Sequence, residues 1–252
     1  MRTVIIHYHL FKNAGTSVDR ILADSFGDKW LNFDKPDENA KILPGEISEF
    51  IGANPQLVAL SSHHVVPPIP VIPGVRVIPL LFIRHPILRA RSAYLFEWQK
   101  AKGLEQPQGS FAEYVKQKVE CNKYGVISNF HVSKLSCIQY SARDFAAKSL
   151  RDYEVLNRAK LLVDSLPFFG LVENFYQSLV RMHYLLKLDF PYLRVKTHEA
   201  NVTQPTVFDV DEKISAIKDE LGEEVFGVLM QANQMDLELY KYASNRFYTV
   251  AR

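Results

Sequence analysis

The sequence of 252 residues predicts an α/β protein, with a central, mainly parallel sheet between layers of helices. Short β-rich runs alternate along the chain with stretches whose apolar residues recur at helical spacing. This alternation is typical of βαβ units, whose strands pair in parallel. The composition, 47% hydrophobic and 23% charged, is that of an ordinary globular chain. No linker or internal repeat divides the sequence, so we expect one domain over residues 1–252.

The expected strands are short, apolar and rich in β-branched residues. Pro79 is unusual inside a sheet, but the run around it is too apolar to be a loop. No element is assigned to residues 27–56. The predicted strands lie at residues 3–9, 57–60, 75–83 and 168–172.

The expected helices follow these strands. Val18, Ile21 and Leu22 fall on one face of the first, at residues 16–26. Pro86 occupies a favourable early helix position before the second. The remaining apolar patterns predict helices at residues 88–100, 110–121, 129–141, 152–165, 174–187 and 223–244.

Charge and cysteine content exclude several classes of partner and site. Thirty Lys and Arg against 28 Asp and Glu give a net charge of +2, which provides no bulk attraction to nucleic acid or anionic membranes. Cys121 and Cys137 are too few for a disulfide framework or a Cys-rich zinc site, so a reduced, cytoplasmic setting is expected. Five prolines and Arg76 interrupt the most apolar stretch, residues 65–83, and exclude a membrane span there.

The loop after the first expected strand has the composition of an anion cradle. It reads His-Leu-Phe-Lys-Asn-Ala-Gly-Thr-Ser over residues 9–17. Its small residues let backbone amides approach a ligand, and Thr16 and Ser17 are expected to cap the following helix. The helix N-terminus adds unpaired N–H groups and Lys12 adds a full charge. The loop is not a Walker A motif, because Lys12 precedes Gly15 by three residues.

A second group of basic residues follows the third expected strand. The sequence Arg-His-Pro-Ile-Leu-Arg-Ala-Arg-Ser-Ala-Tyr spans residues 84–94. Arg84 lies at the strand end and Ser92 two turns into the next helix. An arginine fork and a hydroxyl both suit a phosphate. Because ligands bind at the carboxyl ends of parallel strands, both groups are expected at one edge of the sheet.

Together, K-x-x-G-T-S at residues 12–17 and R-x-P-x-x-R-x-x-S-x-Y at residues 84–94 resemble the sulfotransferases that use 3′-phosphoadenosine 5′-phosphosulfate (PAPS). Further stretches are similar to the carbohydrate-type branch, which includes heparan sulfate enzymes and bacterial relatives: residues 60–64, 170–175 and 236–240. The resemblance covers nearly the whole chain and implies a P-loop-like, three-layer α/β/α fold. The chain departs from the family at His85, where Asp is usual, and at Ser62, where Gly is common.

The resemblance implies a reaction and a set of donor-binding residues. A sulfuryl group would pass in line from PAPS to an acceptor hydroxyl, leaving adenosine 3′,5′-bisphosphate (PAP). The expected acceptor is a carbohydrate or glycoconjugate, with another small metabolite as the alternative. No metal is expected, because Lys12 and backbone amides supply the positive field. The residues implied are Lys12, Asn13, Ala14, Gly15, Thr16 and Ser17 for the 5′-phosphosulfate, and Arg84 and Ser92 for the 3′-phosphate.

The transfer needs a base that titrates near neutral pH, which favours histidine. His63 and His64 follow the second expected strand and should point to opposite sides. The family pattern favours His63 as the base, with His64 as the alternative. His7 and His9 share one strand face, and a packed or hydrogen-bonded pair is expected there in preference to a metal site.

Three other residue groups carry weaker expectations. Lys134 is expected to be solvated, although the family places charge near the donor at this point. Glu173 is expected to start a helix, and residues 196–205 to close over the donor as in relatives.

Three other functions remain open from sequence alone. A P-loop-like kinase should bind ATP with magnesium better than PAP. A metal-dependent hydrolase could use His7, His9, His63 and His64, and its metal content would identify it. A non-catalytic nucleotide sensor would bind the donor without turnover.

Overall fold

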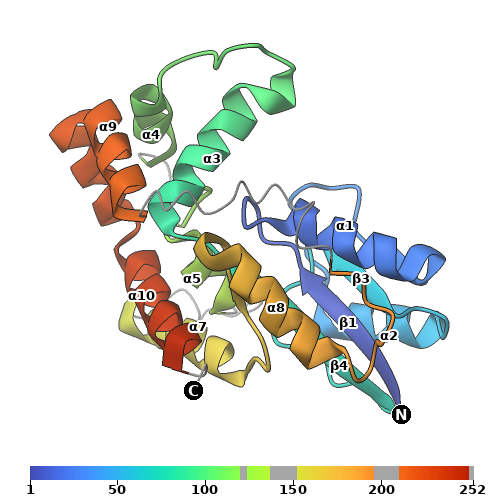
Figure 1. Cartoon of the computed structure of the whole chain (residues 1–252). Helices are drawn as coiled ribbons and strands as arrows, with labels where there is room; N and C mark the ends of the chain where they lie inside the picture. The colour runs from blue at the N-terminus through green and yellow to red at the C-terminus, as the bar shows by residue number, and fades with distance from the viewer. Residues whose placement is uncertain (120–123, 137–151, 196–209, 250–252) are drawn as a thin grey trace.

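The computed structural model describes residues 1–119, 124–136, 152–195 and 210–249 (Figure 1). Its central sheet has five strands in the order β2-β3-β1-β4-β5, and every pairing between them is parallel. The strands are β1 (Arg2–Tyr8), β2 (Trp30–Asn32), β3 (Ala59–Ser62), β4 (Val75–Ile83) and β5 (Gly170–Leu171). The structure therefore confirms the predicted α/β class with a parallel sheet.

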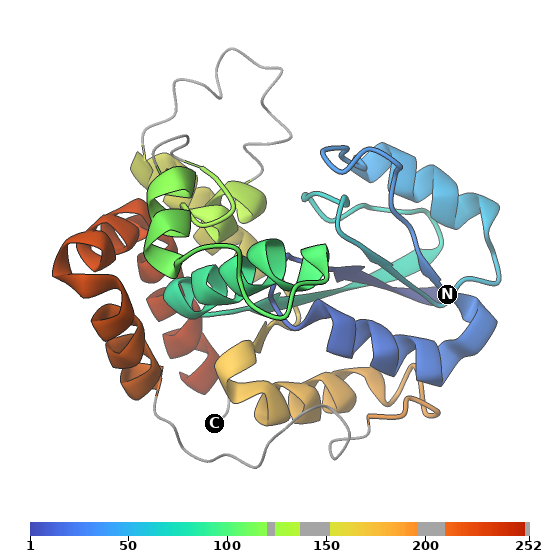
Figure 2. The same cartoon turned by 90° about the horizontal axis from the view of Figure 1, so that it is seen from above.

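Helices cover both faces of the sheet, as the view from above shows (Figure 2). Within the described residues, short 3-10 turns at Gly27–Lys29, Lys100–Lys102 and Val172–Asn174 join some of the elements. The described helices are α1 (Gly15–Phe26), α2 (Pro44–Ala53), α3 (Pro86–Trp98), α4 (Phe111–Val119), α5 (Phe130–Leu135), α7 (Asp152–Ser165), α8 (Phe175–Leu186), α9 (Val210–Ala232) and α10 (Gln234–Thr249).

The alternation of side chains along the strands builds two cores. Ile5 of β1 packs in the layer formed with α1 and α8. Its neighbours Val4 and Ile6 pack in the opposite layer, with α2, α5, α7 and α10. Successive residues of a strand point to opposite faces, so a run that is apolar throughout fits a strand buried on both sides. A third apolar cluster joins α3, α4 and α9 beyond the sheet.

The sheet accommodates Pro79 because β4 pairs with β1 but not with β5 at this residue. It stands opposite Ile6 of β1, whereas β5 pairs only with Phe82 and Ile83. No ladder hydrogen bond is therefore required of Pro79 on the β5 side. The strand predicted at 168–172 is shorter in the structure: it begins only at Gly170, and Val172 already belongs to a 3-10 helix.

The sequence reasoning missed three features of the elements. It assigned nothing to residues 27–56, which contain β2 and α2. It predicted one terminal helix at 223–244, whereas α9 already begins at Val210 and a break at Asn233 separates it from α10. The buried amide of Asn233 donates to the carbonyls of Ile127 and Leu229, which ties the break to the 126–128 turn.

Some predictions fall outside the described residues. Cys121, Cys137 and the 196–205 loop belong to this part of the chain. No helix among the described residues is long and apolar enough to cross a membrane.

Candidate functional site

The Lys12 loop, residues 9–14, connects β1 to α1 and has an unusual backbone. Lys12 and Ala14 both adopt φ 61°, a left-handed conformation uncommon for residues other than glycine. Ala14 is the N-cap of α1 and no side chain caps the helix. The expectation that Thr16 and Ser17 cap it is wrong, because α1 already begins at Gly15 and both residues lie in its first turn. The N–H of Ser17 donates to the Ala14 carbonyl, and those of Gly15 and Thr16 are left for another acceptor.

The electrostatics at this helix start favour an anion. The first turn of α1 contains no acidic residue, and the N-terminus carries the positive end of the helix dipole. Lys12 lies beside it, half-buried, with its ammonium 4.5 Å from the ring centroid of Phe96. Burial, Arg84 and Lys100 all lower the pKa of Lys12, because each disfavours a further positive charge. A phosphate or sulfate would relieve this repulsion.

Arg84 reaches the Lys12 loop because β4 pairs with β1. Its Nη1 donates to the backbone oxygen of Lys12 at 3.2 Å. Ser92, two turns into α3, lines an open pocket of about 340 Å³ together with Lys12. The other residues lining that pocket are Leu95, Phe96, Gln99, Lys100 and Leu104. The structure thus brings Lys12, Arg84 and Ser92 into one region, although Lys12 and Ser92 are 80 residues apart in sequence.

Glu173 lies in the 3-10 turn directly before α8, as expected of a helix-start residue, and its carboxylate has a second role. Its carboxylate is 5% exposed and accepts hydrogen bonds from the His85 N–H and the Tyr240 hydroxyl. It also lies 4.0 Å from Nε of Arg84. Burial raises the pKa of Glu173 while its hydrogen-bond donors and Arg84 oppose the rise. Glu173 therefore braces the turn that presents Arg84.

His63 is held by an aspartate from the loop before α2. Its Nδ1 lies 2.8 Å from Oδ2 of Asp34, whose Oδ1 accepts from the His63 N–H and the Ser62 hydroxyl. Burial alone would raise the pKa of Asp34, but these hydrogen bonds outweigh it and lower the pKa. The ionised carboxylate places the imidazole proton on Nδ1, so Nε2 keeps its lone pair. His63 is 41% exposed, and its geometry is that of an oriented general base.

His64 faces other groups. Its side chain is 10% exposed, and its Nδ1 accepts the backbone N–H of Lys35 at 3.0 Å. The proton of the neutral ring must then sit on Nε2. Neither nitrogen of His64 offers a free lone pair, which distinguishes it from His63.

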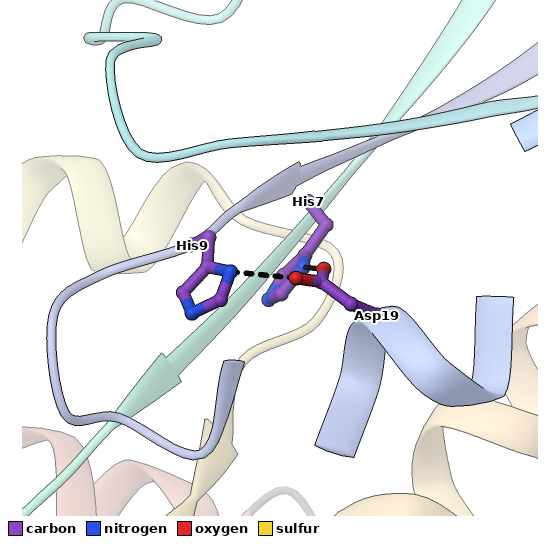
Figure 3. A group of neighbouring side chains, drawn as sticks. All are labelled: His7, His9 and Asp19. Carbon is purple, nitrogen blue, oxygen red and sulfur yellow. Dashed lines mark hydrogen bonds and ion pairs between the residues drawn. The ribbon is translucent and has the colours of Figure 1, made fainter. Parts of the chain in front are cut away.

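His7 and His9 share one carboxylate (Figure 3). His7 Nδ1 lies 2.7 Å from Oδ1 of Asp19, and His9 Nδ1 lies 2.7 Å from Oδ2. The expected hydrogen-bonded pair is therefore present, with Asp19 as the partner that the sequence did not reveal. Burial would raise the pKa of Asp19, but both imidazoles lower it strongly. The same three residues form a possible metal-ligand set, since their donor atoms lie within 4.8 Å of one another.

The His9 ring links the two halves of the site. It stacks on His63 with 3.9 Å between ring centroids. Its other edge packs on Gly15, where an added Cβ would lie 2.0 Å from Cδ2 of His9. Only glycine fits that position, so a packing constraint underlies the glycine of the motif. His9 lies between the start of α1 and His63, which directly follows β3.

Lys134 is half-buried, contrary to the solvated side chain expected from sequence. It lines a small pocket with His63, Ser62 and Tyr8. Burial lowers its pKa, and Lys41 adds to the effect. Lys134 therefore places positive charge on the His63 side of the site.

Sequence reasoning also missed Asp34, Asp19 and the buried pair His131 and Asp236. Asp34 lies in a segment without periodicity and has no motif around it. Asp19 lies one helical turn beyond Gly15, a spacing that places it over the loop. For His131 and Asp236 no local signal exists, because the two are 105 residues apart.

Comparison with known proteins shows that the sequence is similar to a protein for which no function is named. No known protein-family model matches the chain. A protein of Archaeoglobus fulgidus described as uncharacterized is 29% identical over 255 residues, covering 95% of each chain.

Proposed function

We propose that this protein is a sulfotransferase that uses PAPS to sulfate a hydroxyl group, with a carbohydrate or glycoconjugate as acceptor. The observation that carries the proposal is the meeting of the two basic motifs. The carbonyl of Lys12 accepts from Arg84, and Lys12 shares a pocket with Ser92. A ligand in this region would meet two separate sets of anion-binding groups, as a donor with phosphates at both ends of its ribose requires.

The Lys12 loop suits the reacting end of the donor. The S–O bond to the 5′-phosphate breaks, and the phosphate oxygen of PAP takes up the bonding electrons. Lys12 and the N–H groups at the start of α1 can stabilise the charge that grows there. Arg84 and Ser92 can hold the 3′-phosphate, which distinguishes PAPS from ATP.

His63 suits the acceptor end. β3 and β4 flank β1 on opposite sides, so His63 lies across the Lys12 loop from Arg84. Nε2 of His63 would take the hydroxyl proton while the acceptor oxygen forms the new S–O bond. The acceptor class comes from the family resemblance, and the positive charge of Lys134 beside His63 is compatible with an acidic carbohydrate.

A thermal-shift titration tests the donor. We expect PAP to raise the unfolding temperature, and ADP or ATP with magnesium to do so much less. PAP at a hundred times its dissociation constant should add about 2.7 kcal/mol to the free energy of unfolding. Stabilisation by ATP with magnesium alone would instead support a kinase. Where PAP binds, release of PAP from PAPS with a panel of carbohydrate acceptors then separates an enzyme from a sensor.

The alternative function is a metal-dependent hydrolase built on His7, His9 and Asp19. The observation in its favour is the convergence of their donor atoms. Each Asp19 oxygen already pairs with one imidazole, so the cluster is also complete as a hydrogen-bonded unit. Stoichiometric metal in the purified protein, with activity lost on chelation, would favour the hydrolase.

A further inference from the structure

A series of buried, hydrogen-bonded side chains connects α10 to the Lys12 loop. Oδ2 of Asp236 in α10 lies 3.1 Å from Nδ1 of His131 in α5. Nε2 of His131 lies 2.8 Å from Oδ1 of Asn13 in the Lys12 loop. All three residues are at most 1% exposed. These hydrogen bonds thus connect the Lys12 loop to α5 and α10.

The partners of His131 cannot both be satisfied by a neutral ring. Asn13 Nδ2 donates to the carbonyl of Phe11 at 2.9 Å, so its Oδ1 is the atom that faces His131. Asp236 also presents an oxygen, which accepts from the His131 backbone N–H at 2.9 Å. Both ring nitrogens therefore face acceptors. A neutral imidazole carries one N–H, whereas the imidazolium carries two and satisfies both contacts.

The surrounding charges decide which form prevails without a ligand. Asp236 of α10 favours the imidazolium, while Arg89 of α3 and His85 before α3 oppose it. Burial lowers the pKa of His131, Asp236 works against this shift, and Arg89 reinforces it. The residues that α7 buries against α5 are apolar. We therefore expect His131 to be neutral at neutral pH, with one of its two contacts lacking a proton.

We propose that an anion bound at the Lys12 loop draws a proton from solvent onto His131, which then holds the loop through Asn13. This inference rests on the proposed function, because the anion is the phosphate-bearing donor or product. Negative charge beside Asn13 stabilises the imidazolium. Linkage is reciprocal, so a protonated His131 also strengthens anion binding. His131 acts through Asn13 and is a positioning residue.

Proton uptake gives the inference a quantitative signature. Where binding takes up one proton, affinity weakens up to tenfold for each unit of pH increase. We would measure PAP binding by calorimetry near pH 7.5, in two buffers with different ionisation enthalpies. Wild type and His131→Gln are compared, since proton exchange by the phosphates of PAP is common to both. His183→Gln, at a histidine of α8 outside this chain of contacts, is the matched control.

We expect wild type and His183→Gln to take up more protons on binding PAP than His131→Gln. Asn13→Ala should lower the uptake as His131→Gln does, because it removes the connection to the loop. Equal proton uptake by wild type and His131→Gln would overturn the inference while leaving PAP binding, and so the proposed function, intact. Failure of the folded wild type to bind PAP would overturn both.

Nuclear magnetic resonance of the unmodified protein covers the case in which His131→Gln does not fold. The imidazole ¹⁵N signals of the eight histidines can be assigned and followed during a PAP titration. We expect the His131 signals to move toward imidazolium values when PAP binds. Unchanged His131 signals at saturating PAP would overturn the inference.

Discussion

At the scale of single residues, hydrogen-bond partners separate two adjacent histidines. His63 donates through Nδ1 to Asp34 and keeps a lone pair on Nε2. His64 accepts the Lys35 N–H at Nδ1 and has no lone pair left. The two rings have the same intrinsic chemistry, so their surroundings alone select the candidate base. Asp34 is as necessary to this selection as His63 itself.

Replacing His63 should separate transfer from donor binding. We expect His63→Ala to lower the rate of sulfuryl transfer by about 10² to 10⁴-fold, the usual contribution of a general base. Affinity for PAP should stay within a few-fold, because the proposed donor-binding groups lie in the segments that follow β1 and β4, whereas His63 follows β3. The measurement is transfer rate and PAP affinity for His63→Ala and for the neighbouring variant His64→Ala. A fully active His63→Ala protein would move the base to another group, of which His9 is the nearest imidazole.

At the scale of elements, the strand-loop-helix unit of β1 and α1 determines the geometry of the proposed anion site. Two left-handed residues turn the chain so tightly that α1 starts without a side-chain cap. His9 then folds back onto Gly15 and is held by Asp19 from the second turn of α1. The strand-loop-helix unit therefore holds its own loop in place through contacts of His9 with both Gly15 and Asp19.

Gly15→Ala tests this constraint. The added Cβ would overlap the His9 ring, so the ring or the start of α1 must shift. We expect destabilisation of about 1–3 kcal/mol, typical of overpacking, together with weaker PAP binding. Urea unfolding and PAP titration measure the two effects.

Gly227→Ala is the matched control, because a Cβ in that part of α9 meets nothing within 4 Å. It should stabilise the protein by roughly 0.5–1 kcal/mol, as alanine does inside a helix. Equal effects of the two substitutions would contradict the packing of His9 on Gly15.

At the scale of the whole molecule, the parallel sheet brings the candidate site residues together at one edge. The carboxyl ends of β3, β1 and β4 adjoin, so the segments that follow them carry His63, Lys12 and Arg84 to neighbouring positions. Behind this edge the protein buries several titratable groups, among them His7, His85 and His131. These groups connect the stability of the fold to pH.

Acid should destabilise the whole fold already between pH 6.5 and 4. Burial lowers the pKa of His7, His85 and His131, that of His85 to about 4. The unfolded chain, with histidine pKa values near 6.5, then binds more protons than the folded one, so stability falls as pH falls. At pH 5, His85 alone should cost about 2 kcal/mol relative to pH 7.5.

Urea unfolding at pH 7.5 and pH 5 measures this loss. His85→Gln should show a smaller difference between the two values of pH than wild type does. Equal stability of the wild type at both values would show that these histidines are protonated in the folded protein.

Much of this arrangement was determined by the sequence alone, because its signals are local. Helical spacing and apolar runs predicted the α/β class and most of the elements, and the motif spacing predicted that Lys12, Arg84 and Ser92 follow strand ends. β2 and α2 were not predicted, because the apolar residues of their segment show no clear strand or helix period. The division of the C-terminal segment into the two helices α9 and α10 was not predicted, because the apolar pattern continues across Asn233.

Tertiary structure decided the state of each reactive group. Asp34 binds His63 across 29 residues, and His131 meets Asn13 across 118. Such pairings leave no period or motif, since they depend on how distant loops meet at the edge of the sheet. The sequence therefore determined which residues reach the site, and the packing of the whole molecule decided their exposure, protonation and hydrogen-bond partners.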